Sequence, residues 1–163
     1  MANQPILRQI AWISLIPQLF FMLLLFLFYK LIGAEEFLLW GSLTYLLISF
    51  SLRHFIPKYH RKGIRLSGKG NFEEAISQYE KSVEFFTKHA WIDKYRYITL
   101  LSSSKLGYGE MGLCNIAFCY GQLGDIEQTK KYYQIVLEEF PDNGIAQSGL
   151  RLLNALESNK ENG

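Results

Sequence analysis

The sequence predicts an all-α protein in which a two-helix transmembrane hairpin precedes a small domain of paired helices. Two observations indicate this fold class. No residue between Arg8 and Lys30 is charged, and apolar residues crowd into the first third of the chain. Farther on, "GNFEEAISQY" at 70–79 returns in register as "GDIEQTKKYY" at 124–133. We therefore expect a membrane anchor at 1–56, a helical domain at 57–157 and a disordered tail at 158–163.

The first predicted span covers about residues 10–29. Its 20 residues reach about 30 Å, which is the thickness of the hydrocarbon core of a bilayer. A secretory signal peptide is the alternative. The uncharged run is longer than the apolar core of a typical signal peptide, and "KLIGAEE" makes a poor cleavage site. These two features favour a retained helix.

The second predicted span covers about residues 37–54. It has 16 residues between Glu36 and Arg53, or about 24 Å, which is slightly short. Arg53 can snorkel, and His54, Phe55 and Ile56 can extend the helix into the interface. A re-entrant or surface-lying segment is the alternative. A surface helix should be amphipathic, whereas this one is apolar around most of its circumference. We therefore expect a second span.

Lysine and arginine residues predict the orientation of this hairpin. The turn between the helices holds one, Lys30, whereas six follow the second helix between Arg53 and Lys69 with no acid among them. By the positive-inside rule, both termini lie in the cytoplasm. We expect a basic collar to contact anionic lipid headgroups, at about 1 kcal/mol per charge. The collar consists of Arg53, Lys58, Arg61, Lys62 and Arg65.

The repeated stretch has the residues of a tight turn between two antiparallel helices. Gly70 and Gly124 each supply a left-handed end to one helix, so both should have positive φ. The next residue, Asn71 or Asp125, caps the following helix. In the second copy, the predicted helices are Leu113–Leu123 and Ile126–Phe140.

Both copies resemble the tetratricopeptide repeat (TPR), a helix–turn–helix of 34 residues. The residues that carry this resemblance keep their spacing in both copies. They are Gly63, Gly70, Asn71, Ala75 and Tyr79 in the first copy, and Ala117, Tyr120, Gly124, Asp125, Tyr133 and Pro141 in the second. The resemblance implies a short TPR-like α-solenoid with repeats at 57–88 and 108–141, an insert at 89–107 and a C-terminal cap helix at 143–157.

The distance between the two copies departs from the family. They lie 54 residues apart (124 − 70), which is 20 more than one repeat. One inserted helix with turns at 89–107 would account for the excess. The alternative is that the flanking repeat helices are longer than usual. Gly107, Gly109 and Gly112 argue against one long unbroken helix in this region.

The insert carries large aromatic side chains, which a simple spacer would not need. Trp91 and Tyr95 share a helix face, and we expect them to pack near Tyr79 and Phe86 on the second helix of the first repeat. Alternatively, the insert is a free arm that lies on the bilayer with its tryptophan in the interface. Arg96 and Tyr97 would remain exposed for a partner.

The resemblance to the TPR family implies a concave groove that binds a protein or peptide partner. Asn115 matches an asparagine that bonds ligand backbone in many TPR domains, although a surface role of no consequence is the alternative. Asn115, Arg96, Tyr97 and Phe118 are the candidate groove residues. A clamp for C-terminal carboxylates is missing, because its positions hold His60, Ile64, Ile145 and Gly149.

The sequence indicates no enzyme and no bound cofactor or metal. His54, His60 and His89 lie apart, and Cys114 and Cys119 have no second cysteine pair. The net charge of +2 implies no nucleic-acid partner. We expect an adaptor or scaffold that holds a protein partner at the membrane. The alternative is a structural or assembly subunit of a membrane complex, contacted through the hairpin.

Overall fold

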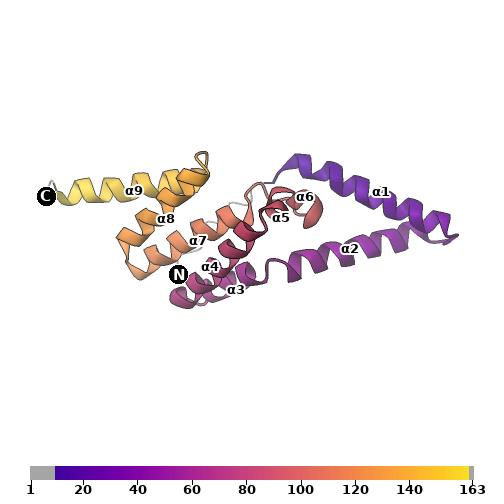
Figure 1. Ribbon diagram of the computed structural model, residues 1–163, viewed down its shortest axis with the longest axis horizontal. Coiled ribbons are helices and arrows are strands. Elements are labelled where there is room, and N and C mark those ends of the chain that lie inside the picture. Colours follow the sequence, from indigo (N-terminus) through magenta and orange to yellow (C-terminus); the bar gives the residue numbers. More distant parts are fainter. Residues whose placement is uncertain (1–9, 162–163) are drawn as a thin grey trace. The chain divides into compact units, whose positions relative to one another are not determined.

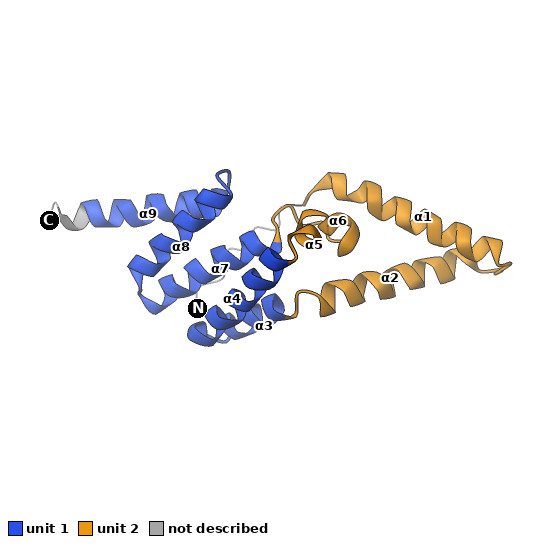
Figure 2. Ribbon diagram, viewed as in Figure 1, with its two compact units in different colours: residues 1–6, 59–88, 108–163 blue, residues 7–58, 89–107 orange. Residues whose placement is uncertain are grey.

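The computed structural model describes residues 10–161, with side chains as far as Ser158, and these residues are mostly helical (Figure 1). They divide into two compact units (Figure 2). The hairpin unit comprises residues 10–58 and 89–107, and the repeat unit comprises residues 59–88 and 108–161. In chain order, the hairpin unit contains the 3₁₀-helix η1 (Trp12–Ser14), α1 (Leu15–Leu31), α2 (Phe37–Phe55), α5 (Ala90–Lys94) and α6 (Arg96–Thr99). The repeat unit contains α3 (Lys58–Ser67) except its first residue, α4 (Phe72–Lys88), α7 (Tyr108–Leu123), α8 (Ile126–Glu139) and α9 (Gly144–Glu161).

Helices α1 and α2 form an antiparallel pair joined by a short turn (Figure 1). The helices approach closely at Gly41, where an added Cβ would lie 2.4 Å from Cδ1 of Phe26. One turn farther along α2, Thr44 shares a 2.8 Å hydrogen bond with the hydroxyl of Tyr29. Small residues and interhelical hydrogen bonds of this kind hold helices together in lipid.

One segment of the described chain, Trp12–Leu31, is long and apolar enough to cross a membrane. Only 6% of its apolar stretch is buried, whereas the core helix of a soluble protein would be mostly covered. Helix α2 ends at Phe55, and Pro57 lies between it and α3, where a proline interrupts helical hydrogen bonding. Spanning by α2 and the cytoplasmic position of the termini stay predictions.

The two predicted turns of the repeat unit are confirmed. Gly70 has φ of 83° and Gly124 has φ of 80°. The amide of Asn71 donates to the carbonyl of Leu66, and the amide of Asp125 donates to that of Tyr120, both at 3.0 Å. This bond closes the end of the preceding helix in each copy. In the second copy, the Asp125 side chain also accepts from the amide of Gln128, as a helix cap does.

Some of the repeat signature residues lie in the core of this unit. Ala75, Tyr79 and Ala117 are fully buried. Gly63 lets α3 approach α4, because an added Cβ would lie 2.7 Å from the ring of Tyr79. Farther along the unit, the ring of Tyr133 fits against Gly149 in the same way. The close contacts between helices explain why glycines occur inside them despite their low helix propensity.

Three predicted boundaries need correction. The insert forms two short helices, α5 and α6, instead of one. Helix α7 begins at Tyr108, so Gly109 and Gly112 lie inside it. Gly112 is required there by close packing, because an added Cβ would lie 2.6 Å from Cγ2 of Val83 on α4.

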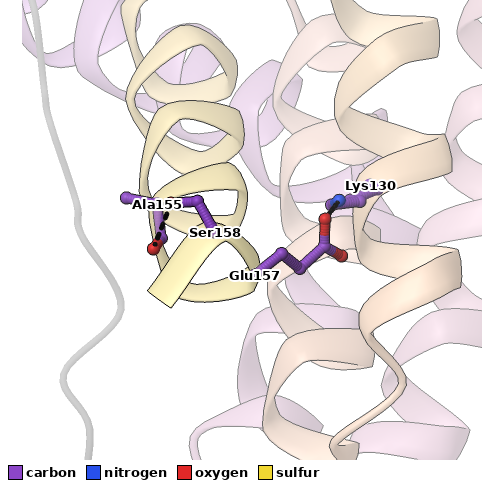
Figure 3. Close-up of polar contacts among 4 residues, drawn as sticks. All are labelled: Lys130, Ala155, Glu157 and Ser158. Atoms are coloured by element: carbon purple, nitrogen blue, oxygen red, sulfur yellow. Dashed lines mark hydrogen bonds and ion pairs between the residues drawn. The ribbon is translucent and has the colours of Figure 1, made fainter. Parts of the chain in front are cut away.

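The third correction concerns the C-terminus. Helix α9 continues to Glu161, past Ser158, where disorder was predicted, and only residues 162–163 of that tail lie outside the described chain. An ion pair between Lys130 and Glu157 links α8 to α9 near this end, and Ser158 bonds the carbonyl of Ala155 (Figure 3). These two contacts lie in a cap helix that extends farther towards the C-terminus than the sequence predicts.

Candidate functional site

One face of α7 remains partly open to solvent. Met111, Asn115, Phe118 and Gln122 follow one another at spacings of four, three and four residues, so they lie on the same side of the helix. All four are partly or fully exposed, whereas the opposite side is buried in the core. The ring of Phe118 packs edge-on against Phe72, at 6.3 Å between centroids.

Asn115 has a free amide on this face. Its side chain is half-buried and makes no hydrogen bond to the part of the chain that the structure describes. A primary amide offers two donors and one acceptor, which is the set that the backbone of a bound peptide can pair with.

Helix α9 repeats the pattern of α7. Ile145, Gly149, Leu152 and Leu156 each follow a residue of the α7 face by 34 positions (145 − 111 for the first pair). The last two are strongly exposed, at 62% for Leu152 and 52% for Leu156. On α3, Ile64 lies six residues before Gly70, as Phe118 lies six before Gly124, and Ile64 is also exposed. We call Ile64, Asn115, Phe118, Leu152 and Leu156, which are partly or fully exposed, the repeat face.

The four predicted groove residues divide between the two units. Asn115 and Phe118 lie on α7 of the repeat unit, and Arg96 and Tyr97 lie on α6 of the hairpin unit. The guanidinium of Arg96 donates to the carbonyls of Asp93 and Ser104, both at 3.0 Å, and also to the carbonyl of Lys105. Arg96 therefore holds the insert together, which corrects the prediction that it is free for a partner.

Trp91 and Tyr95 are not core residues. They remain 60% and 52% exposed, so the prediction that they are buried against α4 is wrong. Other rings of the repeat unit cover that helix: Tyr108 stacks on Phe86 at 4.8 Å, and His60 packs against Tyr79 at 5.5 Å. Because these rings complete the core, the aromatic residues of the insert are not needed there.

The basic collar divides in a similar way. Arg53 donates to the carbonyls of Leu100 and Leu101, which occupies the guanidinium that the sequence assigned to lipid headgroups. The remaining collar residues lie on α3, where Lys58, Lys62 and Arg65 are exposed and Arg61 is half-buried. Headgroup contact by these four stays a prediction.

Burial keeps three titratable groups in the interior of the repeat unit in their uncharged forms. Burial lowers the pKa of His60 to about 4 and raises the pKa values of Cys114 and Cys119 to about 12. At neutral pH, this imidazole is therefore uncharged and both thiols stay protonated. Among the described residues, no three His, Cys, Asp or Glu side chains are placed to hold a metal ion.

Sequence reasoning missed Asn143. This residue is 2% exposed, and its Oδ1 accepts from the amide of Ala146 at 2.8 Å, capping α9. Its Nδ2 donates to Glu110 at 2.8 Å, which connects the cap to the start of α7. An asparagine just before a new helix is a common cap signal and could have identified this role.

Comparison with known proteins identifies part of the repeat unit. Residues 112–143, which include most of α7 and all of α8, match a family model described as "Tetratricopeptide repeat". No curated protein and no solved structure gives a significant match to the chain. Repeats of this family generally mediate protein–protein interaction and are typically not enzymes. Residues 112–143 are therefore similar to one tetratricopeptide repeat, a unit that usually serves to bind another protein.

Proposed function

We propose that this chain is a membrane-anchored adaptor that binds a protein partner along the repeat face at the cytoplasmic side of the membrane. The observation that carries the proposal is the recurrence of exposed positions on α7 and α9 at the 34-residue spacing of the repeat. Such a face lies outside the core of the unit and is free to take up a ligand. The match to a tetratricopeptide repeat supports a protein ligand.

The chemistry of the repeat face indicates the kind of partner. Ile64, Phe118 and Leu152 occupy equivalent positions on α3, α7 and α9, and all three are apolar. Asn115 provides the amide beside them. A partner segment with apolar side chains would bury against the three and pair its backbone with Asn115. The C-terminal carboxylate of a partner would fit the repeat face poorly, because His60 is buried in the core and does not line this face.

The hairpin supplies the membrane location in this proposal. Helix α1 crosses the bilayer, and α2 returns the chain to the same side with 19 residues, or about 28 Å. Exposed apolar side chains extend along both helices, including Phe20 and Leu24 on α1 and Leu46 and Phe50 on α2. Exposed apolar surface of this extent is characteristic of contact with lipid or another protein.

Substitutions on the repeat face test the adaptor function. We would purify the full chain in mild detergent and identify its partners by mass spectrometry, with and without the pair Asn115→Ala and Leu152→Ser. The pair should abolish recovery of a soluble partner, while the control Ile126→Ser, at an exposed apolar residue at the start of α8, should retain it. If the pair leaves the recovered proteins unchanged, the adaptor function is contradicted. Loss of partners after substitution of Leu46 or Phe50 would then favour a structural subunit of a membrane complex.

A further inference from the structure

The insert between the two repeats is built into the hairpin unit. The amide of Ala11 donates to the carbonyl of Ser103 at 3.0 Å, and Ile10 forms an antiparallel bridge with Ser104. From the helices, Gln18 and Arg53 both donate to the carbonyl of Leu101. The insert is therefore attached to the start of α1 and the end of α2, which is the open end of the hairpin.

The two short helices of the insert are held in a fixed arrangement. The hydroxyl of Thr99 donates to the carbonyl of Ile92 at 2.7 Å, which links α6 to α5. The guanidinium of Arg96 bonds the backbone on both sides of α6. Leu100 and Leu101 point inward and are 0% and 3% exposed. Other apolar residues of the insert remain on its outer side, exposed to the surroundings.

Three of those outer residues are strongly exposed. Trp91 lies on α5, Tyr95 joins α5 to α6 and Ile98 lies on α6, and these side chains, which are 60%, 52% and 63% exposed, make up the outer surface of the insert. The ammonium of Lys94 lies 5.6 Å from the ring centroid of Tyr95. The surface thus combines two amphipathic aromatic rings, one aliphatic side chain and one cation.

This surface continues into the outer side of α1. A hollow of about 360 Å³ is lined by residues from the start of the hairpin and from the insert. They are Ile13, Ile16, Pro17, Lys94, Tyr95, Tyr97 and Ile98. Its size lies within the range of small-molecule pockets, about 300–1,000 Å³. Ile13 and Ile16 are also exposed, so the apolar side of the hollow merges with the surface that α1 presents to its surroundings.

We propose that the insert is the interfacial lipid-binding part of the anchor. Trp91 and Tyr95 lie at the headgroup boundary, an acyl chain of an anionic phospholipid occupies the hollow, and Lys94 pairs with its phosphate. Tryptophan and tyrosine favour this depth because their rings are apolar with one polar edge, and lysine can extend its ammonium to the headgroups. The inference rests on the proposed membrane anchoring.

The attachment at Leu101 ties the insert to the hairpin and so favours a lipid in the hollow. The carbonyl groups of the insert bond to both helices of the hairpin, so the depth of the insert is set by the spans themselves. The hollow opens on a helix that is long and apolar enough to cross a membrane. A cation at the margin of an apolar hollow matches a negatively charged headgroup above its acyl chain.

Tryptophan fluorescence in vesicles tests this proposal on the full chain. In the double variant Trp12→Phe and Trp40→Phe, Trp91 is the remaining tryptophan, because the chain has three. The protein would be reconstituted in phosphatidylcholine vesicles containing phosphatidylglycerol. Lipids brominated near the glycerol end should quench Trp91 more strongly than lipids brominated near the chain terminus, and aqueous iodide should quench it weakly. Strong quenching by iodide without quenching by brominated lipid would overturn the proposal, as would no quenching by either.

A second tryptophan, Trp40, shows whether the hairpin is in the membrane independently of whether the insert binds lipid. In the variant Trp12→Phe and Trp91→Phe, Trp40 reports on α2, and brominated lipid should quench it whether or not the insert binds lipid. If Trp40 is quenched and Trp91 is not, the anchor stands and the lipid-binding insert is wrong. If brominated lipid quenches neither, both proposals are contradicted.

The charge part of the proposal has its own matched pair of variants. With Trp91 as the sole tryptophan, brominated phosphatidylglycerol should quench it more than brominated phosphatidylcholine at the same mole fraction. Lys94→Gln should remove this difference. Lys105→Gln, at an exposed lysine of the same insert that does not line the hollow, should preserve it. Equal quenching by the two lipids in the unsubstituted insert would contradict headgroup recognition by Lys94.

Discussion

Gln18 on α1 donates a hydrogen bond from Nε2 to the carbonyl oxygen of Leu101, at 3.1 Å and across 83 positions of sequence. Arg53 on α2 donates to the same oxygen. Leu101 adopts φ of 47°, a left-handed conformation that costs a leucine roughly 1–2 kcal/mol. The two bonds offset this cost and satisfy a polar side chain at the open end of each helix.

We expect Gln18→Leu to loosen the insert. One hydrogen bond contributes a net stabilisation of about 0.5–1.5 kcal/mol, so opening of the insert should become up to about tenfold more frequent. Hydrogen exchange in detergent would measure this at the amide of Ser102, which bonds the carbonyl of Arg96 within the insert. Thr44→Val removes the bond to Tyr29 far from the insert and should leave that exchange rate unchanged. Equal rates in both variants and the parent protein would contradict the role of Gln18.

Gly124→Val should destabilise the repeat unit by about 1 kcal/mol or more, because a β-branched residue is strained at φ of 80°. Thermal unfolding of the full chain, followed by circular dichroism, would measure the change. Gly144→Val is a matched control. Neither position has an atom within 4 Å of an added Cβ, and Gly144 lacks the positive φ. Similar melting temperatures for the two variants would show that the turn imposes no backbone requirement.

The repeat unit should lose stability in mild acid through His60. This side chain is 3% exposed between the rings of Tyr79 and Tyr108, and burial lowers its pKa from 6.5 to about 4. Between these values the unfolded chain binds a proton that the folded chain excludes, so stability falls as the pH drops from 6.5 towards 4. The full effect approaches about 3 kcal/mol. Urea unfolding at a series of pH values would measure the slope.

His60→Phe keeps an aromatic ring between Tyr79 and Tyr108 and removes the titrating group. It should flatten the dependence of stability on pH between 4 and 6.5. His89→Phe, at a half-buried residue outside the repeat unit, serves as the control and should retain the slope. A slope that persists in His60→Phe would assign the acid sensitivity to another group.

Local chemistry made the repeat turns predictable from sequence. A glycine followed by Asn71 or Asp125 specifies both the end of one helix and the start of the next, and no distant residue is needed to form that turn. The length of α7 was not predictable in this way. Gly112 reads as a helix breaker until the position of Val83 on the neighbouring helix is known.

The insert shows the same limitation at a larger scale. Sequence periodicity predicts that Trp91 and Tyr95 share one face, but it does not indicate whether the insert packs against the hairpin or against the repeats. That choice depends on Leu101, whose carbonyl bonds residues far away in the sequence. Arg53 and Arg96 likewise read as available charges, although the structure uses both to bond backbone carbonyls. Sequence reasoning therefore assigned to partners and lipids two side chains that the fold itself requires.

We propose that a hairpin crossing the membrane twice holds the repeat unit at the cytoplasmic face, and cysteine labelling in intact cells tests this topology most directly. The native Cys114 and Cys119 are buried with pKa values raised to about 12, so they should not react. A membrane-impermeant maleimide should label Ala34→Cys, in the turn between the spans, from outside the cell. It should label Asn154→Cys, on α9, only after the membrane is permeabilised. Labelling of both positions from outside would show that α2 does not cross, and would contradict the account.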